Sequence, residues 1–299
     1  MSQVTSLVTG AAGFLGSHTV EALLAKGHKV VALDLPGTSF EANLGPVLAN
    51  PALTTVARDL MSIPADDSFF AGIDYIFHCA GIPDHIASMK TPEPYIQANV
   101  AAVVRVLEAA RAHAIKKVVY PSSAAVYGTA VPPTREDHPI NPDNPYALTK
   151  WMGEEVCRHW SKVFGVGTVS FRVFNGYGPR SAISGPVGFF LKRKKAGEPL
   201  TVTGDGSQTR DFIYVSDIVD ALIAGALSDR SGEVYNLATG KPESVKHLAE
   251  LVGGDIAFIP PRPEPPVILA DVSKLKTELG WEPKVSLAEG IARMVALQS

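Results

Sequence analysis

Tyr146 and Lys150, four residues apart, are the pair in this 299-residue chain best suited to proton transfer. Asn144 fits an N-cap and Pro145 a first helical residue, so both side chains are expected one turn apart on one helix face. A nearby lysine ammonium lowers the pKa of a phenol from about 10 toward neutrality and makes it a general base. The alternative is a helix-surface pair without a catalytic role.

Three glycines, Gly10, Gly13 and Gly16, follow the first apolar run and open a helical pattern. Glycines there allow a tight turn and close approach of the backbone to a pyrophosphate at the helix N-terminus. Asp34 ends the second apolar run, where a carboxylate accepts hydrogen bonds from a ribose 2′-hydroxyl and repels a 2′-phosphate. The pattern predicts NAD rather than NADP. The alternative is a turn chosen for packing, with Asp34 on the surface.

Two serines, Ser122 and Ser123, follow a buried apolar run. They are expected at the carboxyl end of the sheet, where ligands bind in doubly wound folds. A hydroxyl there would bridge a substrate oxygen and Tyr146. Taken alone, both would be ordinary loop serines.

Short apolar runs alternate with helical patterns through the first half of the chain, as in repeated βαβ units. The predicted strands are residues 6–9, 29–33, 54–57, 75–78, 117–121 and 167–171, and the predicted helices are residues 16–26, 93–113 and 145–164. They indicate an α/β fold with a doubly wound parallel (Rossmann) sheet. The rhythm changes near Phe174, where a smaller C-terminal α/β domain is expected. The proline-rich residues 259–266 fit either an interdomain linker or a pocket wall carrying Arg262.

The composition and net charge of the chain limit the kinds of binding partner that are expected. Hydrophobic residues make up 46% of the chain and charged residues 19%, with a net charge of −3, which excludes disorder and gives no general reason to bind nucleic acid or an anionic membrane. No apolar run approaches the roughly 20 residues of a membrane span, and the first residues predict a strand, so no secretion signal is expected. The two cysteines and the dispersed histidines predict a cytoplasmic protein without a disulfide framework or a metal site.

The motifs together resemble the extended short-chain dehydrogenase/reductase family, specifically its NAD-dependent nucleotide-sugar epimerases and dehydratases. The resemblance covers essentially the whole chain. It is carried, in order, by Thr9-Gly-Ala-Ala-Gly-Phe-Leu-Gly16, Phe77-His-Cys-Ala-Gly81, Asn99, Ser122-Ser-Ala-Ala-Val-Tyr-Gly128, Tyr146 with Lys150, Phe174-Asn-Gly-Tyr-Gly-Pro-Arg180 and Gly204-Asp-Gly-Ser-Gln-Thr-Arg-Asp-Phe212.

The resemblance implies a role for each matching residue. The catalytic residues are Ser123, Tyr146 and Lys150. The cofactor-binding residues are Gly10, Gly13, Phe14, Leu15, Gly16, Asp34, Asp59, Leu60, Ala80, Gly81, Asn99, Ser122, Tyr146 and Lys150. The substrate-binding residues are Ser123, Tyr146, Asn175, Arg210 and Arg262. Residues 1–174 with about 209–236 form the NAD-binding domain, and about 175–208 with 237–299 form the nucleotide-sugar-binding domain.

Two alanines indicate which branch of the family the chain resembles. Dehydratases and glucuronate decarboxylases carry carboxylates where this chain has Ala124 and Ala125, so elimination chemistry lacks its acid and base. The closest resemblance is to UDP-glucose (galactose) 4-epimerases, which implies oxidation at C4, rotation of the 4-keto sugar and return of hydride to the other face. A nucleotide-sugar reductase, dehydrogenase or dehydratase is the enzymatic alternative, and a non-catalytic dinucleotide sensor is a further one.

Further expectations also come from the resemblance. Residues 93–113 and 145–164 match the helices through which relatives dimerise, which predicts a homodimer. Relatives usually show Arg-Pro-Gly-Asp where this chain has Arg262-Pro-Glu-Pro265. Gly176 replaces a commoner branched residue, which predicts additional local room.

Overall fold

The structure is a computed structural model that describes residues 3–181 and 185–297. The chain divides into two compact units. The first consists of Met1–Gly128, Ile140–Arg172 and Val219–Tyr235, and the second of Thr129–Pro139, Val173–Ile218 and Asn236–Ser299.

Two stretches that the sequence analysis assigned to the NAD-binding domain lie in the second unit instead. Residues 129–139 belong there because Thr134 forms a β-bridge with Ala270. Residues 209–218 belong there because β9 (Thr209–Arg210) pairs with β12 (Glu243–Ser244) and β10 (Phe212–Tyr214) pairs with β7 (Asn175–Tyr177). These partners are distant in sequence, so local patterns do not indicate them.

Seven strands form one sheet in the order β11-β6-β5-β4-β1-β2-β3. Their bounds are Thr5–Thr9 (β1), Lys29–Asp34 (β2), Leu53–Ala57 (β3), Tyr75–His78 (β4), Lys117–Ser123 (β5), Thr168–Val173 (β6) and Glu233–Leu237 (β11). β1 pairs in parallel with β2 and β4, and parallel pairing continues to β3 and β5. The predicted doubly wound sheet is confirmed. Its order reverses at β1 and β4, which is where such folds bind ligands.

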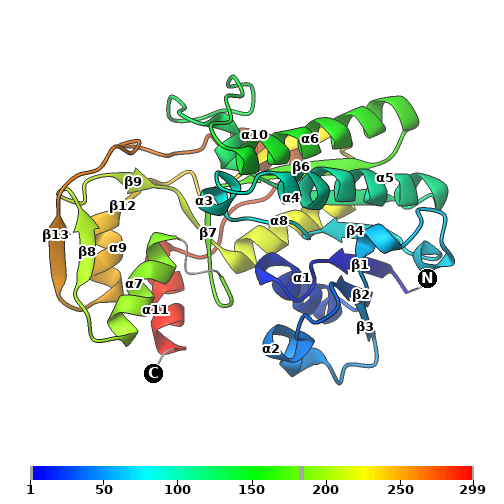
Figure 1. Cartoon of the computed structure of the whole chain (residues 1–299), viewed down its shortest axis with the longest axis horizontal. Helices are drawn as coiled ribbons and strands as arrows, with labels where there is room; N and C mark the ends of the chain where they lie inside the picture. The colour runs from blue at the N-terminus through cyan, green and yellow to red at the C-terminus, as the bar shows by residue number, and fades with distance from the viewer. Residues whose placement is uncertain (1–2, 182–184, 298–299) are drawn as a thin grey trace. The chain divides into compact units, whose positions relative to one another are not determined.

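Helices cover both faces of this sheet. α5 (Ala102–Ala112) and α6 (Pro145–Phe164) lie side by side on one face, and α1 (Phe14–Ala25) and α8 (Val215–Leu227) lie on the other (Figure 1). Short helices α2 (Phe40–Leu44), α3 (His85–Ser88) and α4 (Glu93–Ile96) complete the unit. The predicted helix at 93–113 consists of α4, a π-helical turn at Gln97–Ala101 and α5.

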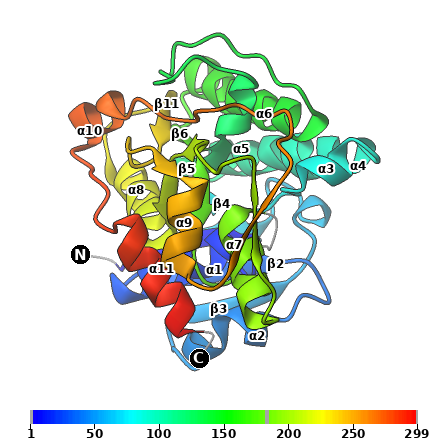
Figure 2. The same cartoon turned by 90° about the vertical axis from the view of Figure 1, so that its left-hand side faces the viewer.

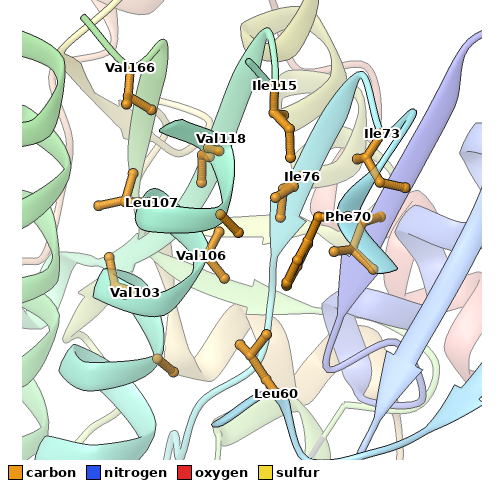
Figure 3. Close-up of a cluster of buried hydrophobic side chains, with 14 of the residues drawn as sticks. Leu60, Phe70, Ile73, Ile76, Val103, Val106, Leu107, Ile115, Val118 and Val166 are labelled. Atoms are coloured by element: carbon orange, nitrogen blue, oxygen red, sulfur yellow. The ribbon is translucent and has the colours of Figure 1, made fainter. Parts of the chain in front are cut away.

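Apolar side chains fill the space between α5 and the sheet (Figure 3). Ile76 of β4 and Val118 of β5 belong to the same fully buried cluster as Val106 and Leu107 of α5. Burying a side chain of this size stabilises the fold by about 1.5–3 kcal/mol. This core therefore holds β4 and β5 in place, and their carboxyl ends carry several of the predicted site residues.

The second unit is built from two-stranded pairs and helices. β8 (Leu200–Thr203) pairs in parallel with β13 (Ile256–Ile259), and α9 (Val245–Val252) lies between α7 (Pro186–Lys195) and α11 (Leu287–Ala296) (Figure 2). α10 (Ser273–Leu279) precedes α11. The buried carboxylate of Asp211 accepts hydrogen bonds from the backbone of Thr239, Gly240 and Ala270 and so ties three segments together. None of the described helices is both long and apolar enough to cross a membrane.

Candidate active site

The glycine loop between β1 and α1 has a conformation that requires glycine. Gly10 has a φ of 64°, and a Cβ there would lie 2.7 Å from the Cα of Ala80. A Cβ on Gly16 would clash with the carbonyl of Gly10. Gly13 is the N-cap residue of α1, and no described side chain caps this helix terminus. The loop thus presents free helix N-terminal amides, which suit a phosphate group.

A cavity of about 490 Å³ lies beside this loop in the first unit. It brings together six residues predicted to bind the cofactor, namely Gly10, Asp34, Asp59, Leu60, Ala80 and Gly81. Ile82, Pro94 and Ala98 add apolar walls that sequence reasoning did not identify. Apolar walls with a few polar groups are typical of a pocket for a flat organic cofactor.

Asp34 is one of the residues that line this cavity. Its carboxylate accepts hydrogen bonds from the backbone N–H groups of Ala12 and Leu35, both at 2.8 Å, which fixes it against the glycine loop. Arg58 also lines the cavity and was not singled out from the sequence. The backbone N–H of Arg58 donates to the carbonyl of Asp34, which keeps the two residues adjacent. Asp34 and Arg58 are therefore neighbours that both line the cavity.

Replacing Asp34 with Ala is expected to weaken NAD binding about tenfold and to improve NADP binding. The variant loses the acceptor for the ribose 2′-hydroxyl and the charge that repels a 2′-phosphate, while Arg58 remains as a partner for that phosphate. Calorimetric titration of both dinucleotides measures the change. Asp67→Ala, which removes a carboxylate outside the cavity, is the control. An unchanged ratio of the two affinities would show that Asp34 does not select the cofactor.

Tyr146 lies in the first turn of α6. The side chain of Asn144 accepts a hydrogen bond from the N–H of Ala147 at 2.9 Å, so the predicted N-cap is present. Ser123 ends β5, the strand against which α6 packs. Burial raises the pKa of Tyr146, and the nearby hydroxyl of Ser123 opposes the shift. The sequence predicted that Lys150 lowers the pKa of Tyr146, so in the chain alone the pKa departs in the other direction.

Lys150 lies one turn further along α6. Its ammonium donates a hydrogen bond to the carbonyl of Pro121 at 2.8 Å and lies 4.8 Å from the centre of the Tyr120 ring. Burial lowers its pKa to about 8, although the nearby Cys79 and Glu154 oppose the shift. The side chain is thus a desolvated cation held at a fixed position between β5 and α6.

Asn99 contacts backbone and α6 instead of facing the cavity. Its side-chain oxygen accepts from the N–H of Ile82 at 2.8 Å, and its amide nitrogen donates to the carbonyl of Ile82 and the hydroxyl of Thr149, both at 3.1 Å. The side chain is 1% exposed. Asn99 therefore anchors the segment after β4, which contains the cavity residues Ala80 and Gly81.

Ser122 points in the direction opposite to Ser123, because neighbouring strand residues face opposite sides. Its hydroxyl donates to the carboxylate of Glu154 at 2.5 Å. The guanidinium of Arg172 donates to the same carboxylate at 2.8 Å and to the Tyr127 hydroxyl at 2.8 Å. This fully buried network was missed. The position of Glu154, one turn after Lys150, is the only sequence signal for it.

Three of the predicted substrate residues, Asn175, Arg210 and Arg262, lie in the second unit, whereas Ser123 and Tyr146 lie in the first. The side chain of Asn175 donates to the carbonyl of Asp211 at 3.2 Å. Arg210 is buried, whereas the side chain of Arg262 is 71% exposed. A Cβ on Gly176 would lie 2.9 Å from Ile218, so the additional room predicted there is absent because Ile218 fills it.

The glycine loop, the carboxylate after β2 and the parallel sheet define a dinucleotide-binding Rossmann protein. The sequence profile of the NAD dependent epimerase/dehydratase family matches residues 6–238. A UDP-glucose 4-epimerase of Mycolicibacterium smegmatis is 35% identical over 309 residues, which cover 97% of each chain.

Solved structures give the same result. The UDP-N-acetylglucosamine 4-epimerase of Methanobrevibacter ruminantium M1, in complex with UDP-N-acetylmuramic acid, matches with a TM-score of 0.90 at 31% identity over 99% of this chain and 100% of that chain. The UDP-glucuronic acid 4-epimerase of Bacillus cereus, in complex with UDP-glucuronic acid and NAD, matches with a TM-score of 0.89 at 30% identity over 99% of each chain.

The chain belongs to the NAD dependent epimerase/dehydratase family. The predicted family is confirmed, and with it NAD as the cofactor on which the family depends. The cavity fits this cofactor, because the glycine loop leaves no space for a Cβ at Gly10 and Asp34 lines the same cavity. No group of three potential metal ligands occurs among residues 3–181 and 185–297.

Proposed function

We propose that this protein is a nucleotide-sugar 4-epimerase that acts on a UDP-hexose or UDP-hexuronate. The observation that carries the proposal is the position of Tyr146 one turn before Lys150 on α6, which packs against the strand β5 that ends at Ser123, with the ammonium of Lys150 anchored on the carbonyl of Pro121. A phenol, a hydroxyl and a cation so arranged are able to move a proton to and from a sugar hydroxyl. The names of the related epimerases support the substrate class.

NAD, when bound, supplies a reversible hydride acceptor for C4 of the sugar. Tyr146 takes the proton of the O4 hydroxyl as that carbon is oxidised and later returns it. Ser123 donates a hydrogen bond to O4 and holds it at the phenol. Lys150 stabilises the phenolate by its positive charge and binds the nicotinamide ribose.

Asn175, Arg210 and Arg262 hold the nucleotide diphosphate in this proposal, because guanidinium groups match phosphate oxygens in charge and geometry. The diphosphate is then the pivot about which the 4-keto sugar turns. Ala124 and Ala125 supply neither acid nor base. The 4-keto sugar therefore has no route to elimination, and return of the hydride completes an inversion at C4.

A proton NMR time course of UDP-galactose with purified protein and no added NAD tests the proposal. Growth of the UDP-glucose anomeric signal would establish a 4-epimerase that retains its cofactor. If the signals stay constant, UDP-glucuronate and UDP-N-acetylglucosamine are added in turn. If the NMR signals of all three nucleotide sugars stay constant, or if added NAD(H) is consumed, a reductase or dehydrogenase would be favoured instead.

A homodimer is part of the same proposal. α5 and α6, the two helices that match the dimerisation helices of relatives, lie side by side (Figure 1). Four helices from two chains would then pack into a bundle. Light scattering is expected to give a molecular mass twice that of the 31.7 kDa monomer. A mass equal to that of the monomer at micromolar protein concentration would contradict the dimer.

A further inference from the structure

Glu264 contacts both arginines to which the proposed function assigns the diphosphate. Its carboxylate lies 2.5 Å from Nη2 of Arg210 and 3.6 Å from Nε of Arg262. The side-chain amide of Gln208 donates to it at 3.4 Å. The side chain of Glu264 is 21% exposed. A single carboxylate thus pairs with two guanidinium groups and remains accessible from solvent.

Arg210 has little freedom to avoid this contact. Its side chain is 8% exposed, and Nη1 donates to the carbonyls of Thr209 at 2.8 Å and Pro265 at 3.0 Å. The other amino nitrogen, Nη2, is the one that donates to Glu264. Burial lowers the pKa of Arg210, and the charge of Glu264 opposes that shift.

The backbone around Glu264 is fixed on both sides. Pro263 and Pro265 flank it, and proline restricts φ to about −65°. The following segment is tied to β9, because the N–H of Thr209 donates to the carbonyl of Pro266 at 2.8 Å. Moving the carboxylate away from Arg210 therefore requires rotation of the Glu264 side chain alone.

We propose that Glu264 is a specificity-determining residue that the diphosphate of the substrate must displace from Arg210 and Arg262. This inference rests on the proposed function. A phosphate oxygen and a carboxylate oxygen repel each other when both approach one guanidinium nitrogen. Only a ligand with more than one negative charge at this position replaces the carboxylate favourably, and the replacement lowers the apparent affinity of the wild-type chain.

Calorimetric titration with UDP alone tests the inference. Glu264→Gln keeps the shape of the side chain and removes its charge, and it is expected to bind UDP about fivefold to tenfold more tightly than wild type. Glu264→Ala, which also removes the acceptor, is expected to do the same. Glu282→Gln is the matched control, since Glu282 is an exposed residue of the same unit that pairs with Lys276. It is expected to leave UDP affinity unchanged.

The outcomes separate the inference from the proposed function. Tighter binding by both Glu264 variants, with thermal melting close to wild type, would support the inference. Unchanged or weaker UDP binding by these variants, with measurable binding by wild type, would overturn the inference and leave the proposed function intact. Absence of UDP binding by wild type and by every variant would overturn both.

Discussion

Replacing Tyr146 with Phe is expected to lower kcat by about 10³-fold while the protein still retains NAD. General acid–base groups contribute about 10² to 10⁴-fold to rate. Tyr146 is the only phenol in the first turn of α6, and it lies one turn before Lys150. Phe keeps the ring that packs beside the site and removes only the proton carrier, so the loss should fall on kcat and leave cofactor binding intact.

Single-turnover formation of the 4-keto sugar and of the epimer, followed by NMR, measures this loss. Tyr75→Phe is the control, because Tyr75 begins β4 at the edge of the sheet opposite to the carboxyl ends. That variant is expected to turn over at the wild-type rate. Retention of more than a few per cent of activity by Tyr146→Phe would show that another group carries the O4 proton.

Local patterns were sufficient for most of the first unit. The apolar runs that end at Asp34 and His78 are buried strands whose pairing follows from right-handed βαβ connections. Strand β11 was missed, although it extends the same sheet next to β6. Between β6 and α8 the chain passes through the second unit, and only then does it reach β11. The spacing from β6 to β11 is therefore too long to indicate a βαβ unit.

Contacts between residues that are distant in sequence could not be predicted, and this limited how much of the site the sequence revealed. The helical spacing of Tyr146 and Lys150 predicted their shared face, because that relation is local. The spacing did not indicate that Ser122 faces Glu154, since strand residues alternate and the partner lies 32 positions away. The ion pair of Arg210 with Glu264 joins residues 54 positions apart. Such pairs depend on packing, so single residues could be nominated from the sequence but not their partners.

Replacing Lys150 with Met is expected to abolish turnover and to stabilise the folded protein at pH 7. The pKa of Lys150 falls from the ordinary 10.5 to about 8 because burial penalises its charge. While the lysine is charged, such a shift costs about 3 kcal/mol of folding stability. Met fills a similar volume without a charge but loses the hydrogen bond to Pro121, so a net gain of about 1–2 kcal/mol is expected.

The pH dependence of that gain distinguishes charge burial from better packing. The folded chain binds this proton less tightly than the unfolded chain, so the penalty is full below about pH 8 and disappears as the pH rises toward 10.5. The advantage of Lys150→Met in urea unfolding should therefore shrink across that range. Lys29→Met, at an exposed position of β2, should change stability by less than about 0.5 kcal/mol at any pH. A gain that stays constant from pH 7 to 10 would assign it to packing, whereas a gain that fades would show that burial of the Lys150 charge destabilises the wild-type fold.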